Sequence, residues 1–298
     1  MGRISLNRKR RLTGYIYLFP ALLLVGLAVG YPIAHIFVMA FSQVNSFGTI
    51  IGYNGFKNFV GLWQSGFTTV IKNTIIWTLS ALVVTIVISL ILAYYLSSTS
   101  IRGQSFFRTM VIIPWAIPLT IVAVLSSMML NSTYGQLNTL LLNIHILKAP
   151  IGWLATAKTS FPMMIVIAVW VSIPFTTLTL LGGMQAIPHD VYEASALDGA
   201  TGFSTFFRVT LPLLTSSLQL VVLINLAYLF NSFPIIWVLT QGGPDNTTAT
   251  ATTYVYQLAF TDGQFGIAGA AALLAFCVLI SVSLVYMWIY RKSEGTML

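Results

Sequence analysis

The chain has 298 residues, of which 57% are hydrophobic and 7% charged, and its formal net charge is +8. A soluble globular domain has roughly 25% charged residues, so this composition cannot cover a water-exposed surface. The mean hydropathy of +0.88 therefore excludes a cytosolic enzyme and a soluble nucleic-acid-binding domain, and it places most of the chain in a lipid bilayer.

Six apolar stretches are long enough to cross a membrane, because a spanning helix needs about 20 residues. None contains Asp, Glu, Lys or Arg, and they cover roughly residues 12–41, 73–98, 109–130, 160–183, 213–240 and 264–290. The first stretch follows a basic cluster, as a signal peptide does, but its length and the lack of a small-x-small cleavage site favour a retained span. We predict an all-α, polytopic membrane protein with six transmembrane helices.

The basic residues fall mainly on one side when the spans alternate from an internal N-terminus. The internal side receives Arg3, Arg8, Lys9, Arg10, Arg11, Arg102, Arg108, Arg208, Arg291 and Lys292, whereas the external side receives Lys57, Lys72, Lys148 and Lys158. This excess of internal basic residues sets membrane orientation. It predicts a multi-pass protein of the plasma or inner membrane with both termini in the cytoplasm, and no nucleic-acid partner.

The segments between the spans divide the chain further. We predict, in order, a basic cytoplasmic N-terminus (1–11), a first transmembrane helix (12–41), an external interfacial segment (42–69), a five-helix core (70–290) and a cytoplasmic tail (291–298). Phe56, Phe59, Leu62 and Trp63 have helical spacing, which predicts an amphipathic helix at the membrane interface.

Two further external segments show different patterns. The stretch from Asn131 to Ser160 is polar and predicts a loop with a short helix. The stretch from Gln241 to Gly263 opens with Gly-Gly-Pro-Asp-Asn, which is a strong turn signal.

The internal connection 184–212 predicts a helix-turn-helix that extends into the cytoplasm. Asp190 and Glu193 have the spacing of a capping box, and Gly199 can supply the left-handed residue that ends the first helix. We expect Ser204 to cap a second helix and Pro212 to mark the start of the next span. Such a surface suits docking into a groove of another protein; the alternative is an interfacial hairpin without a partner.

Candidate substrate contacts must be uncharged, because the spans hold no acidic or basic side chain and His35 is the one histidine near them. Proton-coupled carriers normally place ionisable relays inside the membrane. Asn225, Tyr228 and Ser232 recur at i, i+3 and i+7 and would share one face of a continuous helix. With Ser172 and Phe175 they suit a neutral, hydroxyl-rich ligand, although Asn225 could instead hold helices together.

The acidic residues and histidines show no catalytic or metal-binding pattern. All six acids lie in loops or the tail, and no His-x-x-x-His or Cys pair occurs. The chain also lacks a Gly-Lys dipeptide and therefore a phosphate-binding loop of the ATPase type. We predict no catalytic residue, no metal site and no cofactor bound by this chain.

The internal connection resembles the EAA loop of permeases from ATP-binding-cassette (ABC) importers. Glu193-Ala194-Ser195, Gly199, Val209 and Leu211-Pro212 follow the spacing of that motif, with Ser195 and Val209 in place of Ala and Ile. Four further segments are similar to the carbohydrate-uptake permeases of the maltose, trehalose and glycerol-phosphate type: GFKNF (55–59), NTIIWT (73–78), FFRTMVIIPWAIP (106–118) and LTQGGPDNTT (239–248).

The resemblance implies a subunit that pairs with a second, homologous permease and receives a sugar, of the di- or oligosaccharide class, from an external solute-binding protein. It implies that a cytoplasmic ATPase dimer, which holds ATP and Mg, supplies the energy through the EAA loop. The residues that would couple to this ATPase are Glu193, Ala194, Ser195, Asp198, Gly199 and Pro212.

The resemblance also bears on the substrate. Asn225, Tyr228, Ser232, Ser172 and Phe175 align with positions that contact sugar in the maltose permease. Phe175 lacks the hydroxyl of the family's Tyr, and Leu229 replaces an amide, so maltose itself is in doubt. A polyol phosphate, a peptide or another solute stays open as an alternative cargo, and an ATP-independent secondary carrier as an alternative function.

Overall fold

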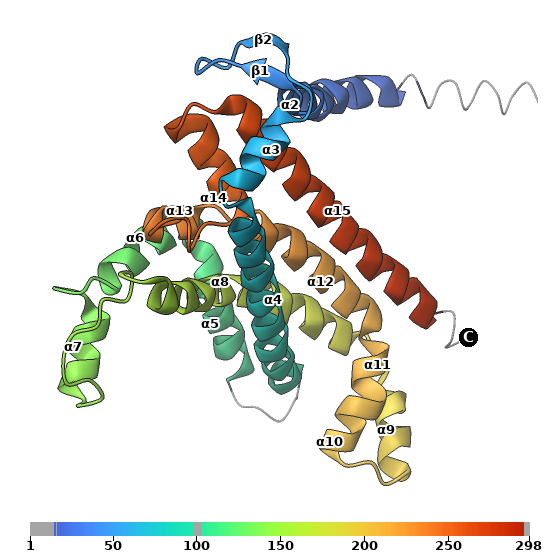
Figure 1. Cartoon of the computed structure of the whole chain (residues 1–298). Helices are drawn as coiled ribbons and strands as arrows, with labels where there is room; N and C mark the ends of the chain where they lie inside the picture. Colours follow the sequence, from blue (N-terminus) through green and yellow to red (C-terminus); the bar gives the residue numbers. More distant parts are fainter. Residues whose placement is uncertain (1–14, 16, 98–102, 295–298) are drawn as a thin grey trace, which may run out of the picture. The chain divides into compact units, whose positions relative to one another are not determined.

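The computed structural model describes residue 15 and residues 17–97 and 103–294 (Figure 1). The basic segment 1–11, Arg102 and residues 295–298 lie outside this part of the chain. Five described helices are long and apolar enough to span a membrane: Tyr17–Ala40, Phe67–Ser97, Ala157–Gln185, Thr215–Thr240 and Phe265–Ile289. A bent pair, Gln104–Ala116 and Leu119–Met129, completes six if it counts as one span. The predicted fold class is confirmed.

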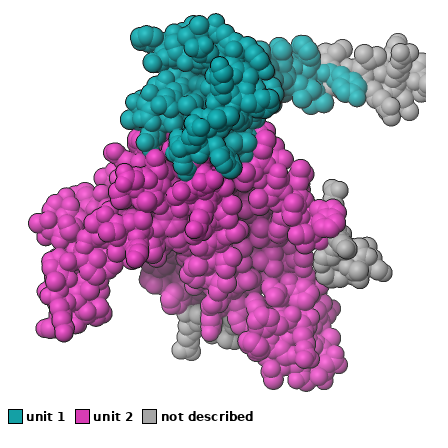
Figure 2. Space-filling view, in the orientation of Figure 1, with its two compact units in different colours: residues 1–66, 255–274 teal, residues 67–254, 275–298 magenta. Residues whose placement is uncertain are grey.

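The chain divides into two compact units, which Figure 2 colours separately. Unit 1 comprises residues 1–66 and 255–274, and unit 2 comprises residues 67–254 and 275–298. The last helix, α15 (Phe265–Glu294), begins in unit 1 and continues through unit 2. The boundaries at 254/255 and 274/275 fall within α14 (Ala251–Tyr256) and α15, and the boundary at 66/67 falls at the turn between α3 (Lys57–Gln64) and α4 (Phe67–Ser97).

Unit 1 contains a short antiparallel hairpin that the sequence analysis did not predict. After a π-helical turn (Gly26–Gly30), its elements are α2 (Tyr31–Ala40), β1 (Ser42–Val44), β2 (Ile50–Tyr53), α3 (Lys57–Gln64), a second π-helical turn (Gln257–Thr261) and the start of α15. The predicted amphipathic helix is confirmed as α3, in which Leu62 is fully buried and Trp63 is exposed.

Asn58 of the GFKNF segment ties this hairpin to the end of the first span. Its side-chain nitrogen donates to the backbone oxygens of Ala40 at 3.0 Å and Ser42 at 2.8 Å. The last carbonyls of a helix have no partner within the helix, so a buried amide here satisfies groups that would otherwise be left without a donor.

Unit 2 is a helical bundle in which α4 and α8 pack along each other and α12 packs against both. Its elements are α4 (Phe67–Ser97), α5 (Gln104–Ala116), α6 (Leu119–Met129), α7 (Gln136–Asn143), α8 (Ala157–Gln185), α9 (His189–Leu197), α10 (Gly202–Thr205), a π-helical turn (Phe206–Thr210), α11 (Leu211–Leu213), α12 (Thr215–Phe230), α13 (Pro234–Thr240) and α14 (Ala251–Tyr256). The loop with a short helix predicted before the fourth span is confirmed by α7.

The third predicted span, 109–130, is not one continuous helix. α5 and α6 meet at an angle of 91°, and the break falls at Ile117 and Pro118. Pro118 disfavours helical backbone angles for the residue before it, and Ile117 is extended, with φ −104° and ψ 125°. Pro114 and Pro118 also lack the N–H that a continuous helix requires.

The fifth predicted span, 213–240, is interrupted as well. α12 ends at Phe230 and α13 begins at Pro234, which has no N–H to donate to the Phe230 carbonyl four residues earlier. That carbonyl accepts a hydrogen bond from the Thr252 hydroxyl at 3.3 Å instead. The residues between the two helices, 231–233, are not helical.

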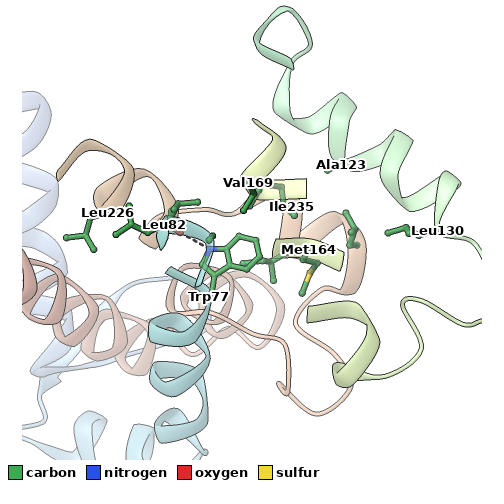
Figure 3. Close-up of a cluster of buried hydrophobic side chains, with 13 residues drawn as sticks. Trp77, Leu82, Ala123, Leu130, Met164, Val169, Leu226 and Ile235 are labelled. Atoms are coloured by element: carbon green, nitrogen blue, oxygen red, sulfur yellow. Dashed lines mark hydrogen bonds between the residues drawn. The ribbon is translucent and has the colours of Figure 1, made fainter. Parts of the chain in front are cut away.

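Trp77 of α4 supports the end of α12 from the centre of the core. Its indole nitrogen donates to the Leu229 carbonyl at 2.9 Å (Figure 3), and the Ser232 amide donates to the same oxygen at 3.1 Å. Trp77 is fully buried in a cluster that also includes Leu82, Met164 and Leu226. The core therefore lies where α4, α8 and α12 meet the broken segments.

The loop after α13 is held against the start of α4. The Asn73 side chain donates to the carbonyl of Thr247 at 3.0 Å, and the Thr74 hydroxyl accepts from the Ala251 amide at 2.9 Å. The turn predicted at Gly-Gly-Pro is confirmed, with left-handed backbone at Gln241 and Gly242. Asn73 and Tyr94 mark opposite ends of α4, about 30 Å apart at 1.5 Å per residue, which is the thickness of a bilayer core.

We expect Trp77→Phe to lower stability, because the Leu229 carbonyl loses one of its two donors while most of the ring packing is kept. A net hydrogen bond contributes about 1 kcal/mol, so the thermal unfolding midpoint of the detergent-solubilised protein should fall by a few degrees. Trp170→Phe is the matched control, because Trp170 is exposed on α8 and its change should leave the midpoint in place. Equal midpoints for the two variants would contradict this role of Trp77.

Candidate functional site

A cavity of about 380 Å³ lies in unit 2 where the break in the third span faces α8 and α12. Its walls come from α5, α6, α8 and α12 and from the link between α5 and α6, and its lining residues are Pro114, Trp115, Ile117, Pro118, Leu119, Val171, Ser172, Phe175, Ile224, Asn225 and Tyr228. The bend at Pro118 forms one wall. The cavity therefore exists because the third span does not continue straight through the bundle.

Four of the five predicted substrate contacts line this cavity: Ser172, Phe175, Asn225 and Tyr228. Ser232 does not. The expected i, i+7 relation with Asn225 assumed a continuous helix, but α12 ends at Phe230 and Ser232 lies in the non-helical link. The structure thus brings the fourth-span and fifth-span residues together, and their role in substrate binding stays a prediction.

An aromatic pair forms the wall between α5 and α8. The rings of Trp115 and Phe175 stack with centroids 5.9 Å apart and planes inclined by 26°. Trp115 was not among the predicted contacts, although it lies in the FFRTMVIIPWAIP segment. Its position between Pro114 and Pro118 was the signal that could have identified it, since those prolines bend the span at this point.

Polar groups on the opposite walls are few and buried. The Asn225 side-chain nitrogen donates to the Thr176 hydroxyl at 3.0 Å and to the Val221 carbonyl at 2.9 Å, which leaves its oxygen as an acceptor. Asn225 thus holds α12 to α8 and lines the cavity as well. The Ser172 hydroxyl is buried and has no hydrogen-bond partner among the described residues, a costly state that a ligand hydroxyl would relieve.

The cavity has no charged side chain among its lining residues. No group of three or more His, Cys, Asp or Glu that could hold a metal ion occurs in the described part of the chain either. Aromatic faces, one amide and two hydroxyls suit a neutral ligand with many hydroxyl groups.

The second candidate site is the loop between α8 and α12, whose first helix is α9. Its end has the hydrogen bonds of a Schellman motif: Ala200 N–H to the Ser195 carbonyl at 3.1 Å and Gly199 N–H to the Ala196 carbonyl at 3.0 Å. Gly199 has φ +76°, so the prediction of a left-handed residue here is confirmed.

The two predicted N-terminal caps of this loop, Asp190 and Ser204, are wrong. α9 begins at His189 with Pro188 as its N-cap, because the fixed φ of proline starts the helix before Asp190 can cap it. Glu193 contacts His189 Nδ1 at 3.0 Å, one helical turn away, on the exposed surface. Ser204 lies inside α10, whose N-cap is Thr201, and the helical path continues to α11, which contains Pro212 as expected.

The remaining residues of the loop motif gather around a notch of about 440 Å³. Ala194, Ser195, Asp198 and Gly199 line it from α9, and Arg208 and Val209 line it from the returning helix. The Ser195 hydroxyl lies 3.2 Å from that of Thr205, which joins the two arms of the hairpin. Pro212 does not line the notch.

Comparisons of the sequence and the fold with known proteins identify the family of this chain. Residues 85–297 match the family of binding-protein-dependent transport system inner membrane components. The chain belongs to this family. It is therefore a permease of an ABC importer, and its location is the inner membrane.

Individual relatives match nearly the whole permease. A probable ABC transporter permease protein of Brucella suis is 37% identical over 96% of this chain and 99% of its own length. The galactooligosaccharide transport system permease protein GanP of Bacillus subtilis is 30% identical over 95% of this chain and 71% of its own length. The crystal structure of a bacterial ABC transporter that imports the acidic polysaccharide alginate matches with a TM-score of 0.82 and 25% identity, covering 97% of this chain and 99% of that one.

Two exposed apolar side chains of the permease were missed by sequence reasoning. Leu197 at the end of α9 is 89% exposed, and Phe203 of α10 is 79% exposed. Figure 1 shows these short helices projecting from the bundle beyond α11. Their exposure follows from the tight turn at Gly199, which directs both arms away from the bundle.

Proposed function

We propose that this permease moves a neutral di- or oligosaccharide across the membrane as one of two homologous permeases of an ATP-driven importer. The observation that carries the proposal is the uncharged cavity with the Trp115–Phe175 stack. Aromatic faces and isolated hydroxyl partners complement the apolar faces and hydroxyl groups of a sugar. An external solute-binding protein would deliver the sugar; the alginate transporter has been crystallised in complex with a periplasmic protein that carries an alginate pentasaccharide.

The uncharged lining of the cavity favours a neutral sugar over a polyol phosphate or an acidic polysaccharide. A polyol phosphate or an acidic polysaccharide would need Lys or Arg to offset its negative charge, and none lines this wall. A peptide would require partners for its backbone amides and its charged termini. The relative GanP is named for galactooligosaccharides, which are neutral and fit the same description.

The loop from α9 to α11 supports coupling to a separate ATPase dimer. Leu197 and Phe203 expose apolar surface beside the polar notch, and such surface is stabilised by contact with another protein. In this proposal the partner holds ATP and Mg, and this chain binds no cofactor. The loop and both termini would face the cytoplasm, with Arg108 and Arg208 on the same side.

A reconstitution experiment tests the function as a whole. Proteoliposomes with both permeases, the ATPase and the solute-binding protein should accumulate a neutral oligosaccharide when ATP is supplied. Vesicles with this chain alone should accumulate none, because the described spans hold no Asp or Glu that could act as a proton relay. Concentrative uptake by the single chain would favour the ATP-independent carrier and overturn the proposal.

We expect Gly199→Val to uncouple ATP hydrolysis from transport while membrane insertion is kept. An added Cβ meets open space, so the cost is conformational: φ is +76°, which costs a β-branched residue about 1 kcal/mol or more. Gly48→Val is the control, because Gly48 also has positive φ and open space but lies in the hairpin of unit 1. The measured quantity is sugar imported per ATP hydrolysed; an unchanged ratio in Gly199→Val would exclude a coupling role.

We expect Ser172→Ala to change the sugar dependence of uptake, whereas Ser232→Ala should not. Both serines are buried, at 4% and 6% exposure, and both lose the same hydroxyl, but Ser172 alone lines the cavity. One hydrogen bond contributes about 1 kcal/mol, so half-saturation should rise roughly fivefold in the first variant. Saturation curves of the complete transporter, with the same binding protein, give the comparison; equal shifts would place the binding site elsewhere.

A further inference from the structure

A second, larger cavity of about 910 Å³ lies at the end of unit 2 that carries the α9–α11 loop. Tyr94 and Tyr95 line it from the last turns of α4, Gln185 from the end of α8, Tyr192 from α9 and Thr205 from α10. No lining residue is shared with the substrate cavity or with the notch that holds the motif residues. One wall belongs to the bundle, and the opposite wall belongs to the coupling loop.

Contacts between the side chains hold these walls in place. The Tyr94 ring meets Phe206 edge-on at 5.2 Å, and the Thr210 hydroxyl donates to the Tyr192 hydroxyl at 3.5 Å. The bond between Ser195 and Thr205 braces the loop behind them. A site whose walls are already ordered loses less entropy when a ligand binds.

The chemistry of the lining matches that of the substrate cavity. Three tyrosines, an imidazole, an amide and several hydroxyls line it, and no Lys, Arg, Asp or Glu is among its described lining residues. Anionic lipids and nucleotides would need cations that these walls do not offer. Ligand pockets for small molecules range from about 300 to 1,000 Å³, so a neutral di- or trisaccharide fits both the volume and the lining.

We propose that this cavity binds the transported sugar on the cytoplasmic side and thereby slows further uptake. A ligand shifts a protein toward the conformation that contains its site. Here the site is formed jointly by the end of the bundle and the coupling loop, so an occupied cavity stabilises the present arrangement of the two. Sugar that accumulates inside the cell would then delay the next cycle. This inference rests on the proposed function.

The test uses the complete transporter in proteoliposomes, with maltotriose and galactotriose as probes. The vesicles are loaded with the same sugar in unlabelled form, and uptake of labelled sugar from outside is measured. The internal concentration is varied from 0 to about 50 mM, which covers dissociation constants on the order of millimolar. We expect internal sugar to reduce the initial rate at saturating external sugar. Two single variants, Tyr95→Ala and Gln185→Ala, should each raise the half-inhibitory internal concentration at least fivefold and leave the rate of empty vesicles unchanged.

Both changed residues are exposed, so neither variant removes a buried contact of the core. Tyr134→Ala is the matched control, since Tyr134 is an exposed tyrosine in the loop before α7 and should keep full inhibition. Titration of each trisaccharide into the solubilised complex, without binding protein, measures the occupancy of the cavity directly. The affinity for the trisaccharide should be fivefold lower in both variants.

The outcomes separate the two proposals. Uptake that is insensitive to internal sugar, or inhibition that is equal in wild type and both variants, overturns the cytoplasmic site and leaves the proposed function intact. Absence of ATP-dependent uptake of either trisaccharide by the complete transporter contradicts the proposed function itself, and this inference fails with it.

Discussion

Backbone groups inside a bilayer find no water, so every break in a spanning helix needs partners from elsewhere in the protein. This permease has two such breaks, before Pro118 and before Pro234. At the second, the Trp77 indole and the Thr252 hydroxyl donate to the carbonyls of Leu229 and Phe230. These bonds let the chain depart from helical geometry at a depth where an unpaired carbonyl would cost several kcal/mol.

The breaks decide where the candidate sites lie. The bend at Pro118 forms one wall of the 380 Å³ cavity, and α8 contributes Ser172 and Phe175 to its lining. The same helix continues to Gln185, and residues 186–188, which are not helical, connect it to α9. Phe175 and Gln185 are about 15 Å apart along this helix at 1.5 Å per residue. The helix that lines the cavity therefore ends at the short link that leads into the α9–α11 loop.

The features that were predictable from sequence are those set by local rules. Charge-free stretches locate the spans, and Gly199 was expected to be left-handed because few other residues adopt that backbone. The bends were not predicted, since a proline in a span permits either a kink or a break and neighbouring helices decide between them. The expected cap at Asp190 failed because Pro188 starts α9 earlier. Whether Ser232 and Trp115 line the cavity could not be predicted from the sequence either. That depends on where a helix ends and on which helices pack against it.

Two of the four positions at which this chain departs from the family pattern, Phe175 and Ser195, have an identifiable partner in the structure. Phe175 lacks a hydroxyl, but it stacks on Trp115, so this position contributes an aromatic face to the cavity, and the polar groups of its lining are those of Ser172, Asn225 and Tyr228. Ser195 adds a hydroxyl where alanine is usual, and that hydroxyl meets Thr205 across the coupling hairpin. The first departure makes the cavity wall less polar and the second adds a polar brace to the loop. Each changed side chain has a contact partner, Trp115 for Phe175 and Thr205 for Ser195. Both substitutions are therefore accommodated within the architecture of the family.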